Sequence, residues 1–328
     1  MATDLDKILK ILKKYTKAEI ISIFNAIMET AEDSNIAEKC DCPWCSGNKV
    51  IRYGKKHGKQ RFFCKDCERT FVPTTKTVMS MSHQPQDIWD AMIDDTVNGH
   101  ALSYSEKRLG ISHQVAFNMR HKILLSLQDK EAADSSVLQD VSELDETFVL
   151  ECYKGKPLPD DINRPARKHG AKAMKRGISD EYICICTGAQ RKSDVILKAV
   201  NRAKPSAEEI AEVFEGHIGE GALLLTDGLR SYNVLESIAD CSIKNVTDEK
   251  TSFYNLNTVN NLHSFVKDQY TFYRGVATKY INRYCALFKY SYRNRKTNLQ
   301  DLKDALLKPG ASKFHSIAEV NRLNLATI

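Results

Sequence analysis

Apolar residues recur every three or four positions along residues 1–38, with a break near Tyr15. This spacing predicts two short amphipathic helices, because residues three and four apart share one face of a helix. A helical cap or a dimerising hairpin is the expected role, and we assign no chemistry to the segment. The apolar positions are Leu5, Ile8, Leu9 and Leu12, followed by Ile20, Ile23, Phe24 and Ile27.

Residues 76–130 show the same spacing and predict a helix-turn-helix domain that reads DNA. Asn98-Gly99 ends a first helical run, and Leu109-Gly110-Ile111-Ser112 is typical of the turn before a recognition helix that ends near Leu127. Helix hairpins that contain glycine are also common in proteins that bind no DNA. The polar positions of the second helix are the expected DNA contacts: His113, Gln114, Asn118, Arg120, His121 and Lys122.

The pattern changes from helical to alternating after residue 130. In residues 141–152, Glu143 and Asp145 fall on one face of a predicted strand, and Leu144 and Glu146 fall on the other. Further strands are predicted at residues 181–188, 194–200, 222–226 and 241–246, with helices at 205–218, at 228–239 and from about Asn257. This order predicts that residues 131–300 form an α/β domain with the mixed sheet of the RNase H-like (retroviral integrase-like) fold.

Four of the ten cysteines form two CxxC pairs, Cys42-Pro-Trp-Cys45 and Cys64-Lys-Asp-Cys67, which are eighteen residues apart. Each pair can aim two thiolates at one ion, and a spacer of this length suits a hairpin. Residues 39–75 are therefore predicted to be a zinc ribbon with these four cysteines as ligands. A redox dithiol is the alternative for a single pair. Cys40 is expected to be a spare thiol that could replace Cys42, and His57 a surface residue at the hairpin tip.

The 328 residues are enough for two or more folded units, and a mean hydropathy of −0.41 is typical of a globular protein. No run of eighteen apolar residues occurs, and the first residues lack the apolar core of a secretory signal. We therefore expect a cytoplasmic protein without a membrane partner, whose cysteines are thiols or metal ligands rather than disulfides. Residues 301–328 are predicted to be a C-terminal tail.

The formal net charge of +6 hides three basic stretches, residues 46–71, 153–178 and 274–296, which hold eight, eight and seven Lys or Arg residues. Such stretches indicate a polyanionic partner, here double-stranded DNA, and the second is predicted to be a mobile loop that follows a DNA backbone. A solvated basic surface is the alternative. The expected phosphate contacts are Lys55, Lys56, Lys59 and Arg61 in the first stretch and Lys168 and Lys172 in the second.

Two aspartates stand at places where α/β folds carry functional carboxylates. Asp145 lies within the first predicted strand of the sheet, and Asp227 directly follows the apolar strand at residues 222–226. In an RNase H-like sheet these two strands are neighbours, so the pair can hold two Mg²⁺ ions for phosphodiester cleavage. Either aspartate alone is a weak indication, because aspartate is common at strand ends.

The zinc ribbon, the helix-turn-helix and three motifs together resemble the bacterial and archaeal transposases of insertion-sequence family fifteen-ninety-five, over roughly residues 40–295. The motifs are LDETFV, LLLTDG with Tyr232 soon after, and NTVNNLHSFVK. The resemblance implies that Asp145, Asp227 and Asn260 are the catalytic residues and bind Mg²⁺, with Mn²⁺ as a substitute. Lys267, two turns beyond Asn260, is the expected contact for the DNA phosphate beside the metals; an ordinary solvated lysine on the helix is the alternative.

The same resemblance implies a DNA transposase that binds the terminal inverted repeats of its element, then cleaves and joins DNA strands. A homodimer or larger synaptic assembly on double-stranded DNA is expected, because two element ends must be held together. Its location would be the cytoplasm of a prokaryote, in association with the nucleoid.

Two positions depart from the family pattern. Asn260 offers a neutral carbonyl oxygen where many relatives have a carboxylate, so it binds Mg²⁺ more weakly and cannot act as a base, although the family includes members with Asn. Asn255 stands where a His often precedes the third motif. Two other functions therefore stay open: a domesticated DNA-binding regulator whose catalytic site has decayed, and a hydrolytic nuclease that performs no strand transfer.

Overall fold

The computed structural model describes residues 12, 14–16, 19–23, 41–56, 58–133, 136–155, 157–160, 162, 164–167, 171–191, 193–248, 251–273, 275–294, 298–308 and 310–312. The chain divides into two compact units, residues 1–81 with 307–311 and residues 82–306 with 312–328. Most of the helical prediction for residues 1–38 lies outside the described residues, as do Cys40, His57, Lys168 and residues 313–328. Among the described helices, none is long and apolar enough to cross a membrane.

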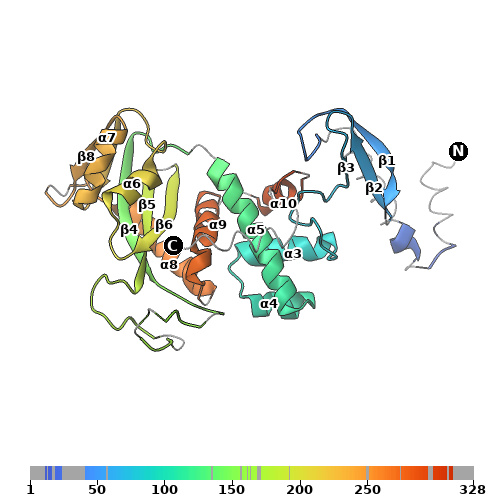
Figure 1. The fold of residues 1–328 in the computed structure, drawn as a ribbon, viewed down its shortest axis with the longest axis horizontal. Helices are drawn as coiled ribbons and strands as arrows, with labels where there is room; N and C mark the ends of the chain where they lie inside the picture. The colour runs from blue at the N-terminus through green and yellow to red at the C-terminus, as the bar shows by residue number, and fades with distance from the viewer. Residues whose placement is uncertain are drawn as a thin grey trace. The chain divides into compact units, whose positions relative to one another are not determined.

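A three-stranded antiparallel sheet of order β1-β2-β3 forms the first unit (Figure 1). Its strands are β1 (Val50–Lys56), β2 (Lys59–Cys64) and β3 (Thr70–Phe71). The turn of the β1-β2 hairpin passes through Gly58 at φ 79°, a conformation that glycine adopts without steric cost. Phe62 and Phe71 pack with Cys42 and Cys64 into a small core. A core of this size needs a further staple, which the cysteines can supply through a metal.

Three helices begin the second unit: α3 (Gln86–Val97), α4 (Leu102–Leu109) and α5 (His113–Ala133). The turn predicted at residues 109–112 joins α4 to α5. Gly110 ends α4 at φ 64°, and the Ser112 hydroxyl oxygen accepts a hydrogen bond of 3.3 Å from a backbone N–H in the first turn of α5. Arg108 of α4 binds the buried Asp95 of α3 at 2.7 Å. This ion pair fixes the angle between the two helices.

The sheet of the second unit has five strands in the order β6-β5-β4-β7-β8. The strands are β4 (Val141–Leu150), β5 (Tyr182–Gln190), β6 (Val195–Arg202), β7 (Ala222–Thr226) and β8 (Cys241–Asn245). β4, β5 and β6 pair antiparallel, whereas β7 is parallel to both β4 and β8. Three antiparallel strands followed by two parallel ones beside the first strand is the RNase H-like arrangement, so the predicted fold class is confirmed.

Helices cover both faces of this sheet (Figure 1). On one face lie α6 (Ala207–Phe214), η1 (Arg230–Val234) and α7 (Leu235–Ile238). On the other lie α8 (Asn257–Phe272), η2 (Thr278–Tyr280) and α9 (Ile281–Arg293), while α10 (Leu299–Leu307) follows. The main core lies beneath α6 and η1, where Leu144, Leu224 and Phe214 are fully buried. Ser206 and Glu209 form a capping box that starts α6.

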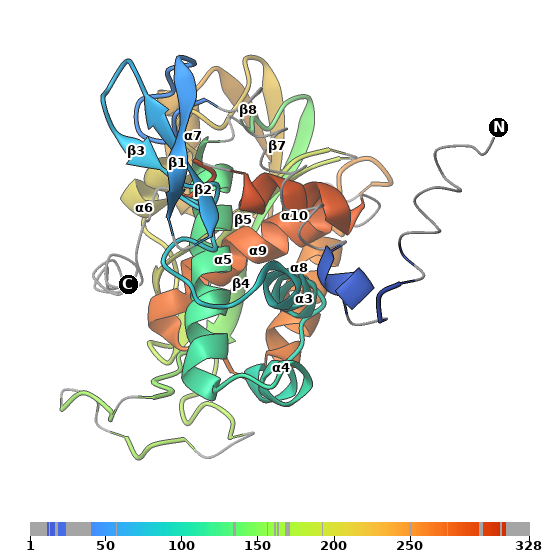
Figure 2. The same ribbon diagram turned by 90° about the vertical axis from the view of Figure 1, so that its right-hand side faces the viewer.

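Helix α5 lies against α9 (Figures 1 and 2). Arg120 is 2% exposed, its Nη2 donates to the backbone oxygen of His100 at 2.7 Å, and its guanidinium lies over the Tyr273 ring. The prediction that Arg120 contacts DNA is therefore wrong, because this side of α5 faces the protein interior. His121 and Lys122 are buried as well. The helical segment and the sheet share one compact unit, rather than separating at the predicted boundary after residue 130.

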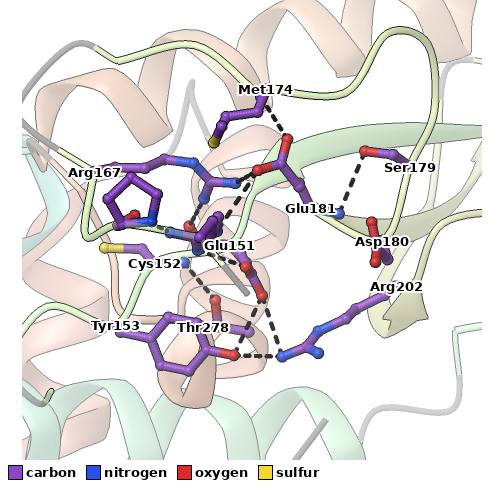
Figure 3. Close-up of polar contacts among 12 residues, drawn as sticks. Glu151, Cys152, Tyr153, Arg167, Met174, Ser179, Asp180, Glu181, Arg202 and Thr278 are labelled. Atoms are coloured by element: carbon purple, nitrogen blue, oxygen red, sulfur yellow. Dashed lines mark hydrogen bonds and ion pairs between the residues drawn. The ribbon is translucent and has the colours of Figure 1, made fainter. Parts of the chain in front are cut away.

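Two buried carboxylates, Glu151 and Glu181, anchor the insertion between β4 and β5 (Figure 3). Glu151 is 2.5 Å from Arg164 and 3.1 Å from Arg202. Glu181 binds Arg167 at 2.8 Å and accepts two backbone N–H groups of the insertion at 2.6 and 3.1 Å. Each arginine thus neutralises a carboxylate that would be costly to bury alone.

This network involves part of the basic stretch at residues 153–178, whose mobility and path along a DNA backbone stay predictions. Arg164 and Arg167, two of its eight basic residues, have side chains only 7% and 14% exposed. Their guanidinium groups bind carboxylates inside the domain, so these two residues are not free to neutralise DNA phosphates. Glu151 and Glu181, the acids that bind them, lie just outside the stretch, so a charge count over the stretch misses them.

His121 sits between aromatic rings, with centroids 4.3 Å from Phe117 and 4.2 Å from Tyr280, and its Nδ1 accepts a hydrogen bond of 3.0 Å from Arg283. Burial lowers the pKa of His121 to about 3, and the charges of Arg283 and Arg120 act in the same direction. The ring is therefore neutral in the folded protein at any pH near neutrality.

We expect the contribution of His121 to the free energy of unfolding to decrease as the pH falls from 7 to 5.5. Below pH 6.5 the unfolded chain binds a proton at residue 121 that the folded chain does not, so His121 contributes a loss of at most about 1.4 kcal/mol at pH 5.5. Urea unfolding at several pH values measures this. His121→Gln should remove this contribution, so its slope of unfolding free energy against pH should differ from that of the parent protein, whereas His113→Gln, at an exposed position of the same helix, should keep the parent slope. An unchanged slope in His121→Gln would contradict the assignment.

Removing the Glu151 carboxylate should release the insertion. Glu151→Ala removes the nearer partner of the buried Arg164, whose Nε also lies 3.6 Å from Glu181, so it should cost at most about 3–5 kcal/mol, and trypsin should cut residues 153–178 faster than in the parent protein. Asp180→Ala is the matched control, because the Lys175–Asp180 pair is 61% and 63% exposed and such pairs contribute little. Equal cleavage of the two variants would show that the buried network does not hold the insertion.

Candidate active site and zinc centre

Two parallel neighbouring strands, β4 and β7, bring Asp145 and Asp227 close together beside the carboxyl end of β7. β4 and β7 pair in a constant register in which Glu143 lies opposite Leu225. Continued by two residues, this register sets Asp145 opposite Asp227, which directly follows the last residue of β7. Functional groups of α/β sheets commonly lie at such strand ends. The structure therefore brings two of the three predicted catalytic residues together.

The Asp145 carboxyl is half-buried, and its ionised form is disfavoured. Burial raises its pKa to about 6, and the negative charge of Asp227 acts in the same direction. A hydrogen bond of 2.9 Å from the Glu146 N–H to Oδ1 and the positive charge of Lys267 oppose this rise. Adjacent carboxylates in a poorly solvated place repel each other, and a cation bound to both removes that repulsion. The pair is therefore suited to hold a hard divalent cation such as Mg²⁺.

The chain leaves β7 through a turn that orients Asp227. Its Oδ1 accepts a hydrogen bond of 3.0 Å from the Leu229 N–H, and the Asp227 side chain is exposed. Gly228 has φ 90°, and a Cβ at that position would lie 2.6 Å from the Asn245 side chain. No larger residue fits there without displacement. The Asp-Gly pair recognised in the sequence thus directs the carboxylate by backbone geometry.

Thr187 and His263 support Asp145 from β5 and from α8. The Thr187 hydroxyl donates to the Asp145 backbone oxygen at 2.6 Å and lies 2.7 Å from His263 Nε2. Since that hydroxyl has one proton, Nε2 must carry the ring proton and donate to Thr187. Burial lowers the pKa of His263 to about 4, so the ring is neutral and its Nδ1 lone pair faces Asp145 Oδ2 at 3.8 Å.

The other two predicted residues, Asn260 and Lys267, lie on the exposed side of α8. Asn260 precedes His263 by about one helical turn, and Lys267 follows it by one. Lys267 is close enough to lower the pKa of Asp145. Among the described residues, no hydrogen bond joins the Asn260 side chain to Asp145 or Asp227. A metal-binding role of Asn260 therefore stays a prediction.

Glu146 faces the opposite side of the sheet, as strand alternation predicts. Burial raises the pKa of its carboxyl to about 7, and the nearby Tyr232 hydroxyl opposes the rise. Tyr232 is fully buried in the core beneath α6. The Glu146 carboxyl is thus turned away from the face that carries Asp145 and His263, and it is not aligned with them as a ligand.

Sequence reasoning did not select Glu143, Thr187 or His263 for a role at this site. For two of them a signal existed: Glu143 shares the polar face of its strand with Asp145, and His263 is three residues from Asn260 on a helix. Thr187 had no local signal, because it is the pairing of β4 with β5 that places it opposite Asp145.

The four cysteines of the ribbon converge as predicted. Their sulfur atoms all lie within 4.8 Å of one another, and Cys42 lies 3.6 Å from Cys67 and Cys45 3.7 Å from Cys64, which brings the two CxxC pairs together. Backbone N–H groups of Trp44 and Gly47 point at the sulfurs of Cys42 and Cys45, each at 3.4 Å. Four convergent sulfurs suit a tetrahedral Zn²⁺ ion, so the residues fit the metal. This arrangement disfavours a redox dithiol within either pair.

The basic residues of the ribbon differ in how freely they reach solvent. Lys55 and Lys59 are exposed, whereas Arg61 is half-buried, with its guanidinium 4.8 Å from the centre of the Tyr53 ring. The side chain of Lys56 lies outside the described residues. Their contacts with DNA stay predictions.

On α5, His113 and Gln114 are exposed and Asn118 is half-buried. Gln114 donates to Asn118 at 2.8 Å, and His113 Nδ1 lies 3.2 Å from Glu106. In the insertion, Lys172 is exposed. These side chains stay predicted DNA contacts.

Comparison with known proteins gives matches along most of the chain. An ISXO2-like transposase domain matches residues 137–293. A protein of the transposable element ISH50 from Halobacterium salinarum is 23% identical over 288 residues, which are 85% of this chain and 90% of that protein.

Two solved Mos1 transposase structures also align, at low similarity. The pre-cleavage transpososome covers 71% of this chain and 80% of its own, at 11% identity and a TM-score of 0.25. The paired-end complex with Mn covers 72% and 81%, at 12% identity and a TM-score of 0.27. The similarity to transposases rests instead on the two sequence matches. Residues 137–293 match an ISXO2-like transposase domain, and the chain is similar over most of its length to a protein of an insertion-sequence element.

Proposed function

We propose that this protein is a DNA transposase that binds the terminal inverted repeats of an insertion sequence and catalyses metal-dependent strand cleavage and strand transfer. The observation that carries the proposal is the pair Asp145 and Asp227, set side by side on β4 and after β7 within the transposase domain. Hydrolysis of the element end frees a 3′ hydroxyl, and attack of that hydroxyl on target DNA joins the strands.

Asp145, Asp227 and the amide oxygen of Asn260 would hold Mg²⁺ in this function, with Mn²⁺ as a substitute. Ions held by these residues would supply activation of the attacking oxygen and stabilisation of the leaving oxygen of the phosphodiester. The protein's own part is orientation. Thr187 fixes the backbone of Asp145 and the ring of His263. Exposure of Asp227 leaves one side of the site open to DNA.

Lys267 would contact the phosphate beside the metal site, since its charge already acts on Asp145 and its side chain is exposed. A lysine placed there holds the phosphate through charge and hydrogen bonding without fixing a base sequence. Its effect would therefore be uniform across DNA sequences.

Recognition of the element ends would come from the zinc ribbon and from α5. On the ribbon, the basic side chains neutralise phosphates, while polar side chains at the start of α5 reach base edges. The assigned residues are Lys55, Lys56, Lys59 and Arg61 on the ribbon, His113, Gln114 and Asn118 on α5, and Lys168 and Lys172 in the insertion. A homodimer or larger assembly on two ends, in the cytoplasm of a prokaryote beside the nucleoid, completes the proposal.

Loss of either aspartate should abolish the reaction. Asp145→Ala and Asp227→Ala should each lower cleavage and joining of a labelled element end in Mg²⁺ by about 100-fold or more, since even outer-shell changes at metal sites cost 10–100-fold. Asp248→Ala is the control, because this exposed acid follows β8 and has no assigned role. The rate of joining in a gel assay is the measurement.

Each outcome of that assay separates the candidate functions. Joining by the parent protein that equals joining by Asp227→Ala rules out an enzyme that uses this site. Cleavage without joining favours a hydrolytic nuclease. Specific binding of the ends with neither reaction favours a regulator derived from a transposase.

Removal of zinc should weaken binding to element ends. Cys64→Ser breaks the tetrahedral site and the small core around Phe62, so the protein should lose its zinc and bind the end DNA at least about 10-fold more weakly. Cys241→Ser, outside the cluster, should keep both properties. Fluorescence anisotropy with end DNA, together with zinc analysis, tests this; unchanged affinity after verified metal loss would exclude the ribbon from end binding.

A further inference from the structure

The Glu143 side chain is fully buried, and its carboxylate holds the first turn of α8. Oε2 accepts hydrogen bonds from the backbone N–H groups of Thr258 at 2.6 Å and Val259 at 3.0 Å, and Oε1 accepts one from the Thr258 hydroxyl at 2.9 Å. All three donors lie within two residues of Asn260. A carboxylate at the start of a helix is also favoured by the helix dipole.

Arg191 completes this arrangement from the end of β5. Its Nε donates to Glu143 Oε1 at 2.8 Å, which balances the buried charge. Its Nη2 donates to the backbone oxygens of Phe253 at 2.7 Å and Asn255 at 3.2 Å. One guanidinium therefore ties the segment before α8 to the carboxylate that holds the helix. We call Glu143 and Arg191 the α8 clasp.

The helix has no comparable support of its own. Its N-cap residue, Leu256, gives no side-chain hydrogen bond to the helix. Asn255 supplies one acceptor, since its Oδ1 binds the Asn257 N–H at 3.1 Å. The next two N–H groups of the first turn depend on Glu143. The place where α8 begins is therefore set mainly by a strand residue more than a hundred positions away.

The same strand also carries Asp145. Glu143 and Asp145 are two residues apart on one face of β4, so the backbone that places the metal-binding carboxylate also places the acceptor for α8. A shift of the helix start moves Asn260 relative to Asp145 and Asp227. A neutral amide binds Mg²⁺ weakly, so its contribution depends on being held in place before the ion arrives.

We propose that Glu143 and Arg191 are positioning residues that set Asn260 against Asp145 and Asp227. This inference rests on the proposed function for the part that Asn260 plays in the metal site. Neither residue of the clasp touches DNA or metal in this proposal. Their effect passes through Asn260, and it therefore vanishes when Asn260 no longer contributes a ligand.

A double-mutant cycle measures that dependence. Glu143→Gln keeps the shape of the side chain and removes its charge, so it should weaken Mn²⁺ binding, followed by electron paramagnetic resonance, about 10-fold. The rate of end cleavage should fall by a similar factor. In an Asn260→Ala background, the same change should alter either quantity no more than about 2-fold.

Glu131→Gln is the matched control. Glu131 is another carboxylate in a salt bridge, with a side chain 11% exposed; it is paired with Lys289 at 3.2 Å and Arg293 at 3.4 Å, but it joins α5 to α9. Any effect that Glu131→Gln has should be the same with and without Asn260. Arg191→Lys serves as a second clasp variant if Glu143→Gln does not fold, and it should show the same dependence on Asn260.

The outcomes are distinct. Equal losses from Glu143→Gln in both backgrounds mean that the clasp only stabilises the fold, which overturns the proposal. It is overturned as well if Asn260→Ala leaves Mn²⁺ binding unchanged, or if Glu143→Gln and Arg191→Lys leave it unchanged. Failure of the proposed function would be seen in a different measurement, as end cleavage that does not depend on Asp227. In that case the double-mutant cycle on Mn²⁺ binding still decides the role of the clasp.

Discussion

The pairing of β4 with β7 is the constraint on which the rest of the second unit depends. It sets two carboxylates, Asp145 and Asp227, side by side where burial already disfavours the charge on Asp145. A fold that keeps such a pair must offset their repulsion. Here Lys267 on α8 and a backbone N–H at Glu146 do so in part. The negative charge of Asp145 and Asp227 that is not balanced explains why the site suits a cation. A bound ion would reduce the repulsion between the two carboxylates and so stabilise the pairing of β4 with β7.

The register of β4 controls more than this pair. Glu143 and Asp145 point toward α8, while Leu144 and Glu146 point toward the core beneath α6. A slip of one residue would exchange these faces, burying the site and exposing the core. Nine consecutive residue pairs with β5 lock the register against such a slip. The long antiparallel pairing of β4 with β5 therefore supports the short parallel pairing of β4 with β7. It fixes which side chains of β4 face the candidate metal site and the start of α8.

Local patterns predicted the elements that depend on periodicity and spacing, and failed where distant packing decides. The alternation around Asp145 and the CxxC spacing each report a geometry contained within a few residues. Arg120 misled because polarity was equated with exposure, whereas α9, more than a hundred residues later, covers that side of α5. The count of basic residues over 153–178 has a related weakness, because the glutamate that neutralises Arg164 lies outside the stretch. The role of Thr187 could not be predicted from the sequence, because only the pairing of β4 with β5 places it opposite Asp145.

The two candidate metal sites differ in a way that would suit different tasks. In the ribbon, four sulfurs converge within 4.8 Å, which fills a tetrahedral shell and leaves no position for substrate, as in a structural zinc site. At the candidate site beside β4 and β7, Asp145 is half-buried while Asp227 and Asn260 are exposed. Protein atoms would therefore occupy only one side of any ion held there. An incomplete shell of oxygen ligands is what a hard cation needs in order to bind a phosphate oxygen as well. The residue types and their burial therefore make the cysteine cluster closed and the site at Asp145 open. A closed site suits a structural role, whereas an open one can take part in a reaction.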